Sequence, residues 1–195
     1  MEFVDRPDEI TWRWTSNGAY TSKSAYLAQL QGAYCTFDAQ SIWRVYAEGK
    51  HKFFAWLLVQ TKILTADKLE ARNWPCEQNC VLCDQERETG AHLCLHCPFA
   101  KQVWLLVSNW TSGSVTMPED PSENVEEWWR RSLSSLSQSQ RRSVAAVLMY
   151  TTWNLWKERN RRVFDSKSLQ PHNVFSIIKE EVLLRRVACV QLVVE

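Results

Sequence analysis

The sequence predicts a mostly α-helical fold with one N-terminal β-hairpin, a small corner held by cysteine and histidine side chains, and a C-terminal helical segment. Three observations predict it. Apolar residues recur at helical spacing from about residue 52 onward, a turn-forming pair lies among aromatic residues near the N-terminus, and four of the seven cysteines lie between residues 80 and 97. With 45% hydrophobic residues and eleven tryptophans, the chain of 195 residues can bury a substantial core.

The N-terminal segment, residues 11–21, predicts the β-hairpin. Three aromatic residues alternate about Asn17-Gly18, and this dipeptide is the strongest short signal for a hairpin turn. A serine at position 22 or 24 can then cap a helix that we expect to reach Gln31.

Three further helices are expected before residue 111. Residues 52–63 are densely apolar and long enough for a buried helix, and Thr65 can cap the next one, over residues 66–73. Pro98 suits the first position of a helix that runs to Trp110. We expect most tryptophans in the core, because their large rings favour burial. The best core candidates are Trp43, Trp56 and Trp104.

Beyond Trp110 the composition changes. Residues 111–124 are rich in turn-forming residues and predict a linker. A helix over 125–136 and a long one over about 140–164 follow, and Pro171 opens the last helix. The expected buried face of that last helix comprises Val174, Ile177, Ile178, Val182 and Leu183.

The chain's surroundings can be inferred from what it lacks. No secretory signal is visible at the N-terminus, and the longest apolar stretch, residues 144–156, is too short and too polar to span a bilayer. We therefore expect an intracellular protein of the nucleus or cytoplasm, without a membrane partner, where thiols stay reduced. An odd number of cysteines also fits a disulfide framework poorly, so metal binding is the better interpretation.

Cysteine spacing points to zinc. Two cysteines separated by two residues form half of a tetrahedral zinc site, and Cys80 and Cys83 have this spacing. Ligand chemistry alone does not decide which residues supply the other two ligands. Cys94 with Cys97 would complete an all-cysteine site, and His92 with Cys97 would complete a site of three cysteines and one histidine. His96 also lies within reach.

Between Thr11 and Trp104 a set of residues recurs in a fixed order. It runs Trp12, Asn17-Gly18-Ala19-Tyr20, Ser24-Ala25-Tyr26, Ile42-Trp43, Phe53 to Trp56, Ile63-Leu64-Thr65, Leu69, Cys80, Cys83, Glu88-Thr89, His92-Leu93, Cys97-Pro98 and Val103-Trp104. With these residues the segment resembles the zinc-binding domain that follows the reverse transcriptase in plant non-LTR (LINE-type) retroelements. Residues 153–164 resemble the tail that often follows this domain.

The resemblance implies one structural Zn²⁺ held by Cys80, Cys83, His92 and Cys97. The chain differs from the family at Cys94, where a bulky apolar residue is usual. The implied organisation is a reverse-transcriptase-type zinc-binding domain over residues 1–110, the linker over 111–124, and a C-terminal helical region over 125–195. The chain would then be the end of a retroelement reading frame without its polymerase.

Basic residues suggest where a nucleic acid would bind. Net charge is only +1, so a uniformly basic surface is excluded. Positive groups gather in two places, and their side chains can neutralise phosphates. The cluster at residues 157–162 can equally well be the C-terminal end of a helix, where positive side chains interact favourably with the helix macrodipole. The predicted contacts are Lys157, Arg159, Arg161 and Arg162, with Lys50 and Lys52 as a second patch beside Phe53.

Catalysis is not expected. Polymerase and ribonuclease H chemistry need clustered carboxylates for two metal ions, and a zinc with four protein ligands has no open position for water. Two classes of function remain. One is a module that binds RNA or DNA weakly and without sequence preference, and the alternative is a protein-interaction or regulatory module retained from a retroelement fragment.

Overall fold

The computed structural model describes residues 11–29, 39–118 and 120–191. The chain divides into two units, Met1–Phe37 and Asp38–Glu195, and each is described by itself. The predicted end of the first helix at Gln31 lies outside the described residues.

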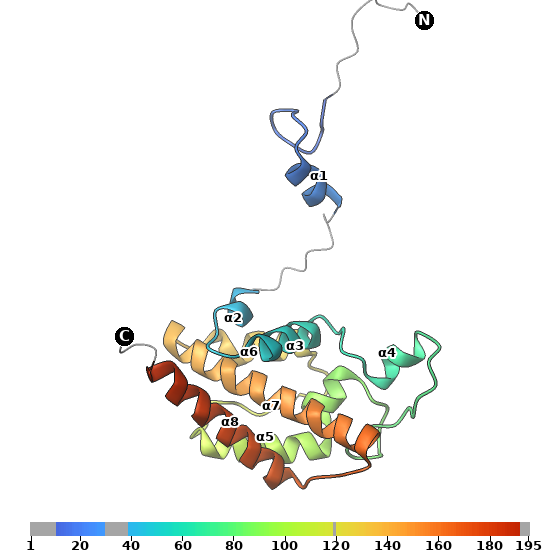
Figure 1. Cartoon of the computed structure of the whole chain (residues 1–195), viewed down its shortest axis with the longest axis vertical. Coiled ribbons are helices and arrows are strands. Elements are labelled where there is room, and N and C mark those ends of the chain that lie inside the picture. Colours follow the sequence, from blue (N-terminus) through green and yellow to red (C-terminus); the bar gives the residue numbers. More distant parts are fainter. Residues whose placement is uncertain (1–10, 30–38, 119, 192–195) are drawn as a thin grey trace, which may run out of the picture. The chain divides into compact units, whose positions relative to one another are not determined.

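The described residues are mostly α-helical, as the sequence predicts. The helices of each unit are shown in Figure 1. In chain order the elements are α1 (Ser22–Gln29), α2 (Gln40–Trp43), α3 (Gly49–Val59), α4 (Ala66–Glu70), η1 (His92–His96), α5 (Pro98–Trp110), α6 (Val125–Ser134), α7 (Gln138–Asp165) and α8 (Pro171–Gln191).

The predicted N-terminal β-hairpin is wrong, since residues 11–29 contain no strand. The chain does turn at Gly18, which has a φ of 67°, and the Trp12 amide donates to the Gly18 carbonyl at 2.8 Å. The second strand expected after this turn does not form, because the helix α1 already begins at Ser22. Thr21 and Ser24 exchange hydrogen bonds between side chain and backbone at 3.0 Å each, which starts α1 three residues after the turn.

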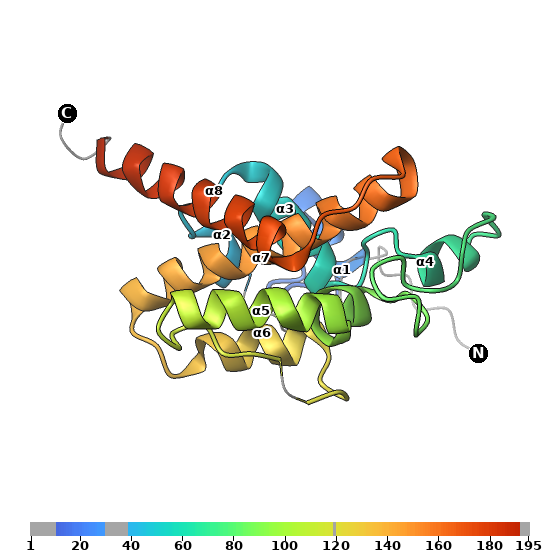
Figure 2. The ribbon, with the colours of Figure 1, turned by 90° about the horizontal axis from the view of Figure 1, so that it is seen from below.

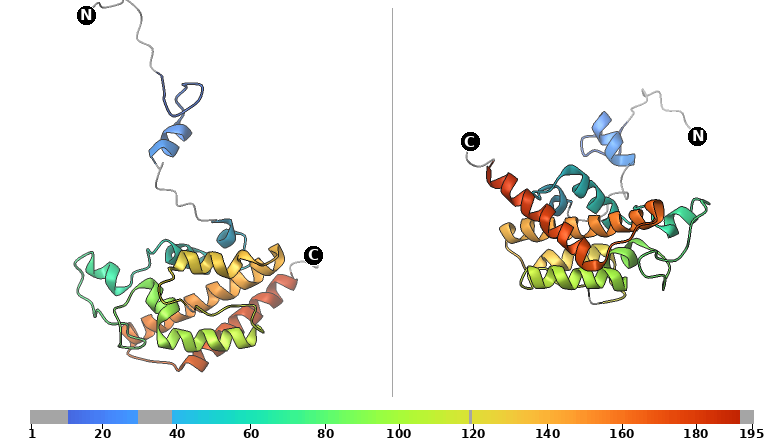
Figure 3. Two further views of the ribbon diagram at one scale, coloured as in Figure 1. Left: turned by 180° about the vertical axis from the view of Figure 1, so that it is seen from behind. Right: turned by 60° about the horizontal axis from the view of Figure 1, so that its bottom comes forward.

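In the second unit, α7 packs against α8 and α3, and also contacts α2, α5, α6 and η1. α8 also packs against α5. Figure 2 shows α7 and α8 crossing each other, and Figure 3 shows α8 beside α5. The fully buried residues of this core include Trp104, Trp128, Tyr150 and Leu148. Trp104 and Trp128 meet edge to face, with ring centroids 5.3 Å apart.

Local sequence explains where these helices begin. Asn124 and Glu127 form a reciprocal capping box at the start of α6, and Ser137 and Gln140 form another at the start of α7. Pro98 and Pro171 open α5 and α8, as predicted.

The predicted core is confirmed in part. Trp104 is fully buried and Trp56 is half-buried, but Trp43 is 47% exposed, so its placement in the core is wrong. On α8, Val174, Ile178 and Val182 are buried as expected, whereas Leu183 is 43% exposed.

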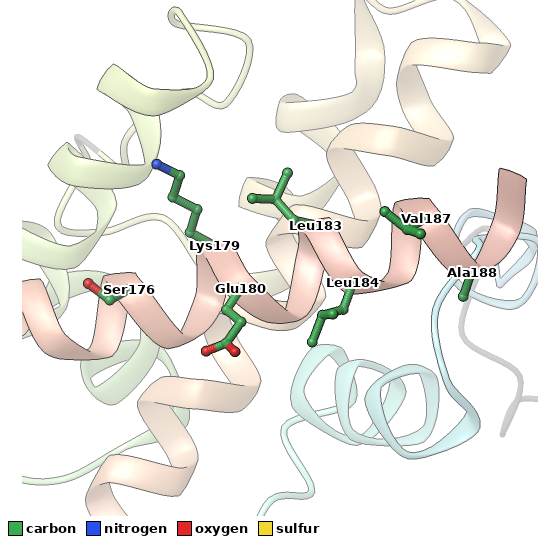
Figure 4. Close-up of a pocket in the computed structure, with 7 residues that line it drawn as sticks. All are labelled: Ser176, Lys179, Glu180, Leu183, Leu184, Val187 and Ala188. Carbon is green, nitrogen blue, oxygen red and sulfur yellow. The ribbon is translucent and has the colours of Figure 1, made fainter.

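Leu183 belongs to an apolar strip on the outer side of α8. Leu184 and Val187 continue it, with Lys179 and Glu180 at its N-terminal end (Figure 4). Among the described helices, none has the length and apolar character needed to cross a bilayer.

Candidate metal centre

The structure brings four of the predicted ligands together. The ligand atoms of Cys80, Cys83, His92 and Cys97 all lie within 4.8 Å of one another. Cys80 Sγ lies 3.9 Å from Cys97 Sγ, and Cys83 Sγ lies 3.3 Å from His92 Nε2. Three of these side chains are buried and Cys83 is half-buried.

These spacings suit a tetrahedral zinc site. Zn–S bonds of about 2.3 Å and a Zn–N bond of about 2.0 Å place two sulfur ligands roughly 3.8 Å apart, and a sulfur and a nitrogen roughly 3.5 Å apart. The same distances exclude a disulfide between Cys80 and Cys97, since a bonded pair of sulfurs lies about 2.05 Å apart. The described cysteines are all free thiols.

The first pair of ligands is held by a tight turn. The amides of Cys83 and Asp84 both donate to the Cys80 carbonyl, at 3.2 and 2.7 Å, and Asp84 takes a left-handed φ of 56°. A single antiparallel bridge between Asn79 and Arg87 closes the loop that follows. The two thiols therefore face the same point.

The second pair depends on the π-helical turn. In η1 the Cys97 amide donates to the His92 carbonyl at 2.7 Å, a closure one residue wider than in an α-helix. Thr89 Oγ1 accepts from the His92 amide at 3.0 Å and fixes the start of the turn. This backbone carries both His92 and Cys97 toward the cysteines of the first turn.

The competing side chains lie outside the cluster. Cys94 is fully buried outside the four-residue cluster, and its carbonyl accepts from Trp104 Nε1 at 2.7 Å. Burial raises the pKa of the Cys94 thiol well above its usual range. His96 Nε2 lies 3.0 Å from the Glu123 carbonyl oxygen.

Cys80 and Cys97 share a proton between their thiols, and a bound cation would replace that proton. The hydrogen bond from Cys80 to Cys97 raises the pKa of the Cys80 thiol to about 12 and lowers the pKa of Cys97. Two buried thiols this close cannot both ionise without a positive charge between them. Metal binding would remove both protons, because thiolate is the ligand form of cysteine.

A carboxylate supports the histidine from behind. Glu86 Oε2 lies 3.1 Å from His92 Nδ1, at ion-pair distance. His92 thus presents Nε2 to the cysteines and Nδ1 to an acid, which is the usual second contact of a metal-binding histidine.

The acidic loop between the ligand pairs also anchors the site to α7. Glu88, 1% exposed, accepts from Arg159 Nε at 3.1 Å and from Arg159 Nη2 at 2.8 Å. The same carboxylate accepts from the Ala66 amide at 3.0 Å. The only sequence signal for Glu88 is its place among the positions that resemble the retroelement domain.

Arg162 makes a second link between α7 and the site. Its Nη1 donates to the carbonyls of Val81 and Leu82, both at 3.1 Å, in the turn between Cys80 and Cys83. Its guanidinium also lies over the Phe99 ring, 4.7 Å from the centroid. No local pattern in the sequence indicates this contact.

The residues predicted to contact nucleic acid are placed as follows. Arg161 and Arg162 pair with the fully buried Glu158, at 2.6 and 2.9 Å. Lys157 lies 3.5 Å from Glu181. On α3, Lys50 is exposed, and the half-buried Lys52 donates to the Trp43 carbonyl at 3.2 Å. Three of these cations thus face two carboxylates, and Arg159 is buried against a third, that of Glu88.

Comparison with known proteins bears on the same segment. Residues 20–104, which contain all four clustered side chains, match the family described as zinc-binding in reverse transcriptase. The match confirms the resemblance. A protein of Arabidopsis thaliana named "Putative ribonuclease H protein" is 20% identical over 166 residues, which cover 80% of this chain. The aligned part covers 25% of that protein's length. No solved structure gives a significant match.

Proposed function

We propose that this chain is a zinc-stabilised nucleic-acid-binding module of a LINE-type retroelement polyprotein, without polymerase activity of its own. The observation that carries the proposal is the convergence of Cys80, Cys83, His92 and Cys97 within 4.8 Å, inside a segment that matches a zinc-binding family. One Zn²⁺ bound by four protein ligands would serve structure, because no coordination position stays open for chemistry.

Metal analysis of purified variants tests the zinc site. The parent should carry one zinc per chain, Cys97→Ala should lose it, and Cys94→Ala should keep it. The two variants are well matched, since both remove a fully buried thiol from neighbouring turns. Zinc that persists in Cys97→Ala and disappears in Cys94→Ala would contradict the assignment.

The exposed side of α3 is the surface that supports nucleic-acid binding. Phe53 is 54% exposed and stacks with Trp56, with ring centroids 6.1 Å apart and planes 24° apart. Lys62 Nζ lies 5.6 Å from the centroid of the Trp56 ring. Aromatic rings beside lysines bind single strands without strong sequence preference, because every base has a π-face.

The arginines of α7 are the weaker part of this proposal. A phosphate would have to compete with the Glu158 carboxylate for Arg161 and Arg162. Glu158 is fully buried and accepts hydrogen bonds from these two arginines and from the Leu169 amide, the last at 2.8 Å. Arg159 is too buried to reach a strand without breaking its pair with Glu88. We therefore place the main phosphate contacts at Lys50, Lys52 and Lys62.

Salt-titrated binding to single-stranded RNA and to duplex DNA tests the proposal. In Lys50→Gln/Lys62→Gln, the slope of log K against log salt for a single strand should fall by about 1.4 at most, since each lost phosphate contact removes about 0.7. The control Lys167→Gln/Lys179→Gln removes the same charge from exposed sites outside α3 and should keep the parental slope. Phe53→Ala should weaken binding by about 1–3 kcal/mol.

The alternative, a protein-interaction module, is favoured by the apolar strip on α8. Leu184 and Val187 are 63% and 58% exposed there (Figure 4). Exposed aliphatic side chains that lie next to each other are typical of surfaces that bind another protein. If the parent binds neither RNA nor DNA at low salt, this second function applies. Its surface can then be checked with Leu184→Lys in a partner-binding or self-association assay.

A further inference from the structure

A cavity of about 330 Å³ lies between α7 and α8, far along the chain from the cysteine cluster. The i, i+4 spacing of Arg142 and Ala146 turns both side chains toward α8, and the i, i+3 spacing of Val182 and Arg185 turns both toward α7. Tyr46, from the segment between α2 and α3, completes the wall. This volume lies within the range of small-molecule sites, about 300–1,000 Å³.

Three arginines contribute to the wall of this cavity. Arg142, Arg185 and Arg186 all line it, and the Nε of Arg185 is buried without a hydrogen-bond partner. A buried donor without an acceptor costs free energy, and an anion in the cavity would supply the missing acceptor. Arginine forks also match phosphate oxygens better than any other side chain does.

The remaining wall is apolar and aromatic. Ala146 and Val182 contribute aliphatic surface, and Tyr46 is 60% exposed. The Arg142 guanidinium lies 5.7 Å from the Tyr46 ring centroid. A flat ring can stack beside this pair while a phosphate on the same ligand reaches the guanidiniums.

Two carboxylates lie near the cavity, and one of them, Glu48, interacts electrostatically with Arg185. Tyr150 donates its hydroxyl proton to Glu48, whose carboxylate also lies 2.8 Å from His51 Nδ1. Glu181 accepts from Asn154 Nδ2 at 2.7 Å and lies 3.5 Å from Lys157. Three arginines against these two carboxylates leave a net positive charge around the cavity.

We propose that this cavity, the arginine pocket, binds a nucleotide, with its phosphate on Arg142, Arg185 and Arg186 and its base beside Tyr46. The site is distinct from the zinc cluster and from the lysines of α3, so it does not depend on strand binding. The same chemistry comes from a free mononucleotide or from the phosphorylated end of a strand.

Calorimetric titration of the zinc-loaded full chain tests the pocket. The probes are adenosine monophosphate, adenosine and inorganic phosphate. The monophosphate should bind at least tenfold more tightly than either fragment. Arg142→Gln/Arg185→Gln should weaken its binding at least tenfold, whereas Arg130→Gln, an exposed site on α6 outside the pocket, should leave it unchanged. Tyr46→Ser should weaken the monophosphate more than it weakens inorganic phosphate.

The outcomes separate this inference from nucleic-acid binding by α3. Equal affinity for adenosine and adenosine monophosphate, or a double variant that binds as the parent does, would overturn the pocket even if RNA binds elsewhere. Failure of the monophosphate to bind would overturn it too. A 5′-phosphorylated oligonucleotide that gains affinity over its unphosphorylated form, only in the presence of Arg142 and Arg185, identifies a strand end as the source. Thermal melts of each variant establish that it remains folded.

Discussion

Replacing Arg159 with alanine should destabilise the protein far more than a change in a surface arginine does. The guanidinium and the Glu88 carboxylate it pairs with are 7% and 1% exposed. Among the residues that the structure describes, the Ala66 amide would be the donor that remains to this buried carboxylate in the variant. We therefore expect Arg159→Ala to cost about 3–5 kcal/mol, the range for breaking a buried ion pair from one side.

The chain contains a matched surface pair for comparison. Arg87 and Glu70 lie 2.8 Å apart, the same distance as Arg159 and Glu88, but are 67% and 50% exposed. Water solvates both partners when this pair is broken, so Arg87→Ala should cost about 0–1 kcal/mol. Burial, and not separation, then accounts for the difference between the two variants.

Urea denaturation of zinc-loaded protein, followed by tryptophan fluorescence, measures both costs. Glu88→Gln in the Arg159→Ala background should restore part of the lost stability, because a neutral amide is easier to bury than a lone carboxylate. A cost below about 1 kcal/mol for Arg159→Ala would refute the reasoning. The arginine would then be free enough to contact phosphates.

Three further predictions follow from the same structure. A chelator should unfold at least residues 76–104, because binding of a structural zinc is coupled to folding, with apparent binding energies of about 10 kcal/mol or more. Circular dichroism would measure the loss of helix, and full retention of helicity would contradict this prediction. Trp104→Ala should cost about 3–5 kcal/mol in a urea melt, and Trp43→Ala, at an exposed position, about 0.5 kcal/mol; equal costs would contradict the burial. Burial lowers the pKa of His51 below its ordinary 6.5, so the unfolded chain takes up a proton first as the pH falls. Stability should be complete above about pH 6.5 and decline below it, and His51→Gln should flatten that decline when urea midpoints are compared across pH.

The metal cluster could be predicted from sequence because its geometry is local. Cys80 and Cys83 are joined by one turn, and His92 and Cys97 by another, so spacing alone places each pair. Spacing alone could not choose between His92 and Cys94. The π-helical turn η1 brings His92, and not Cys94, toward the other cysteines. No residue pattern in this segment predicts a π-helical turn.

The predictions that failed concern competition between neighbouring elements. Asn17-Gly18 does form a turn, but the side-chain cap at Thr21 starts a helix before a strand can pair. Trp43 lies in an apolar context, yet the four-residue length of α2 leaves its ring on the outer side. Local propensity is a weak guide where two short elements compete for the same residues.

The arginines of α7 show why composition alone cannot assign a basic cluster to a ligand. Arg159 finds its carboxylate 71 residues earlier in the chain, and Arg162 finds carbonyls 81 and 80 residues earlier. Both partners belong to the loops that carry Cys80, Cys83 and His92. Zinc in those loops would stabilise the carboxylate and carbonyls that these arginines contact, and the arginines would in turn stabilise the loops, because coupling between two sites acts equally in both directions. The match to the zinc-binding family ends at residue 104, yet the side chains that anchor its metal loop come from beyond that limit. In the fold, the positive charge that the sequence offers to nucleic acid therefore helps to hold the loops of the Cys/His cluster in place.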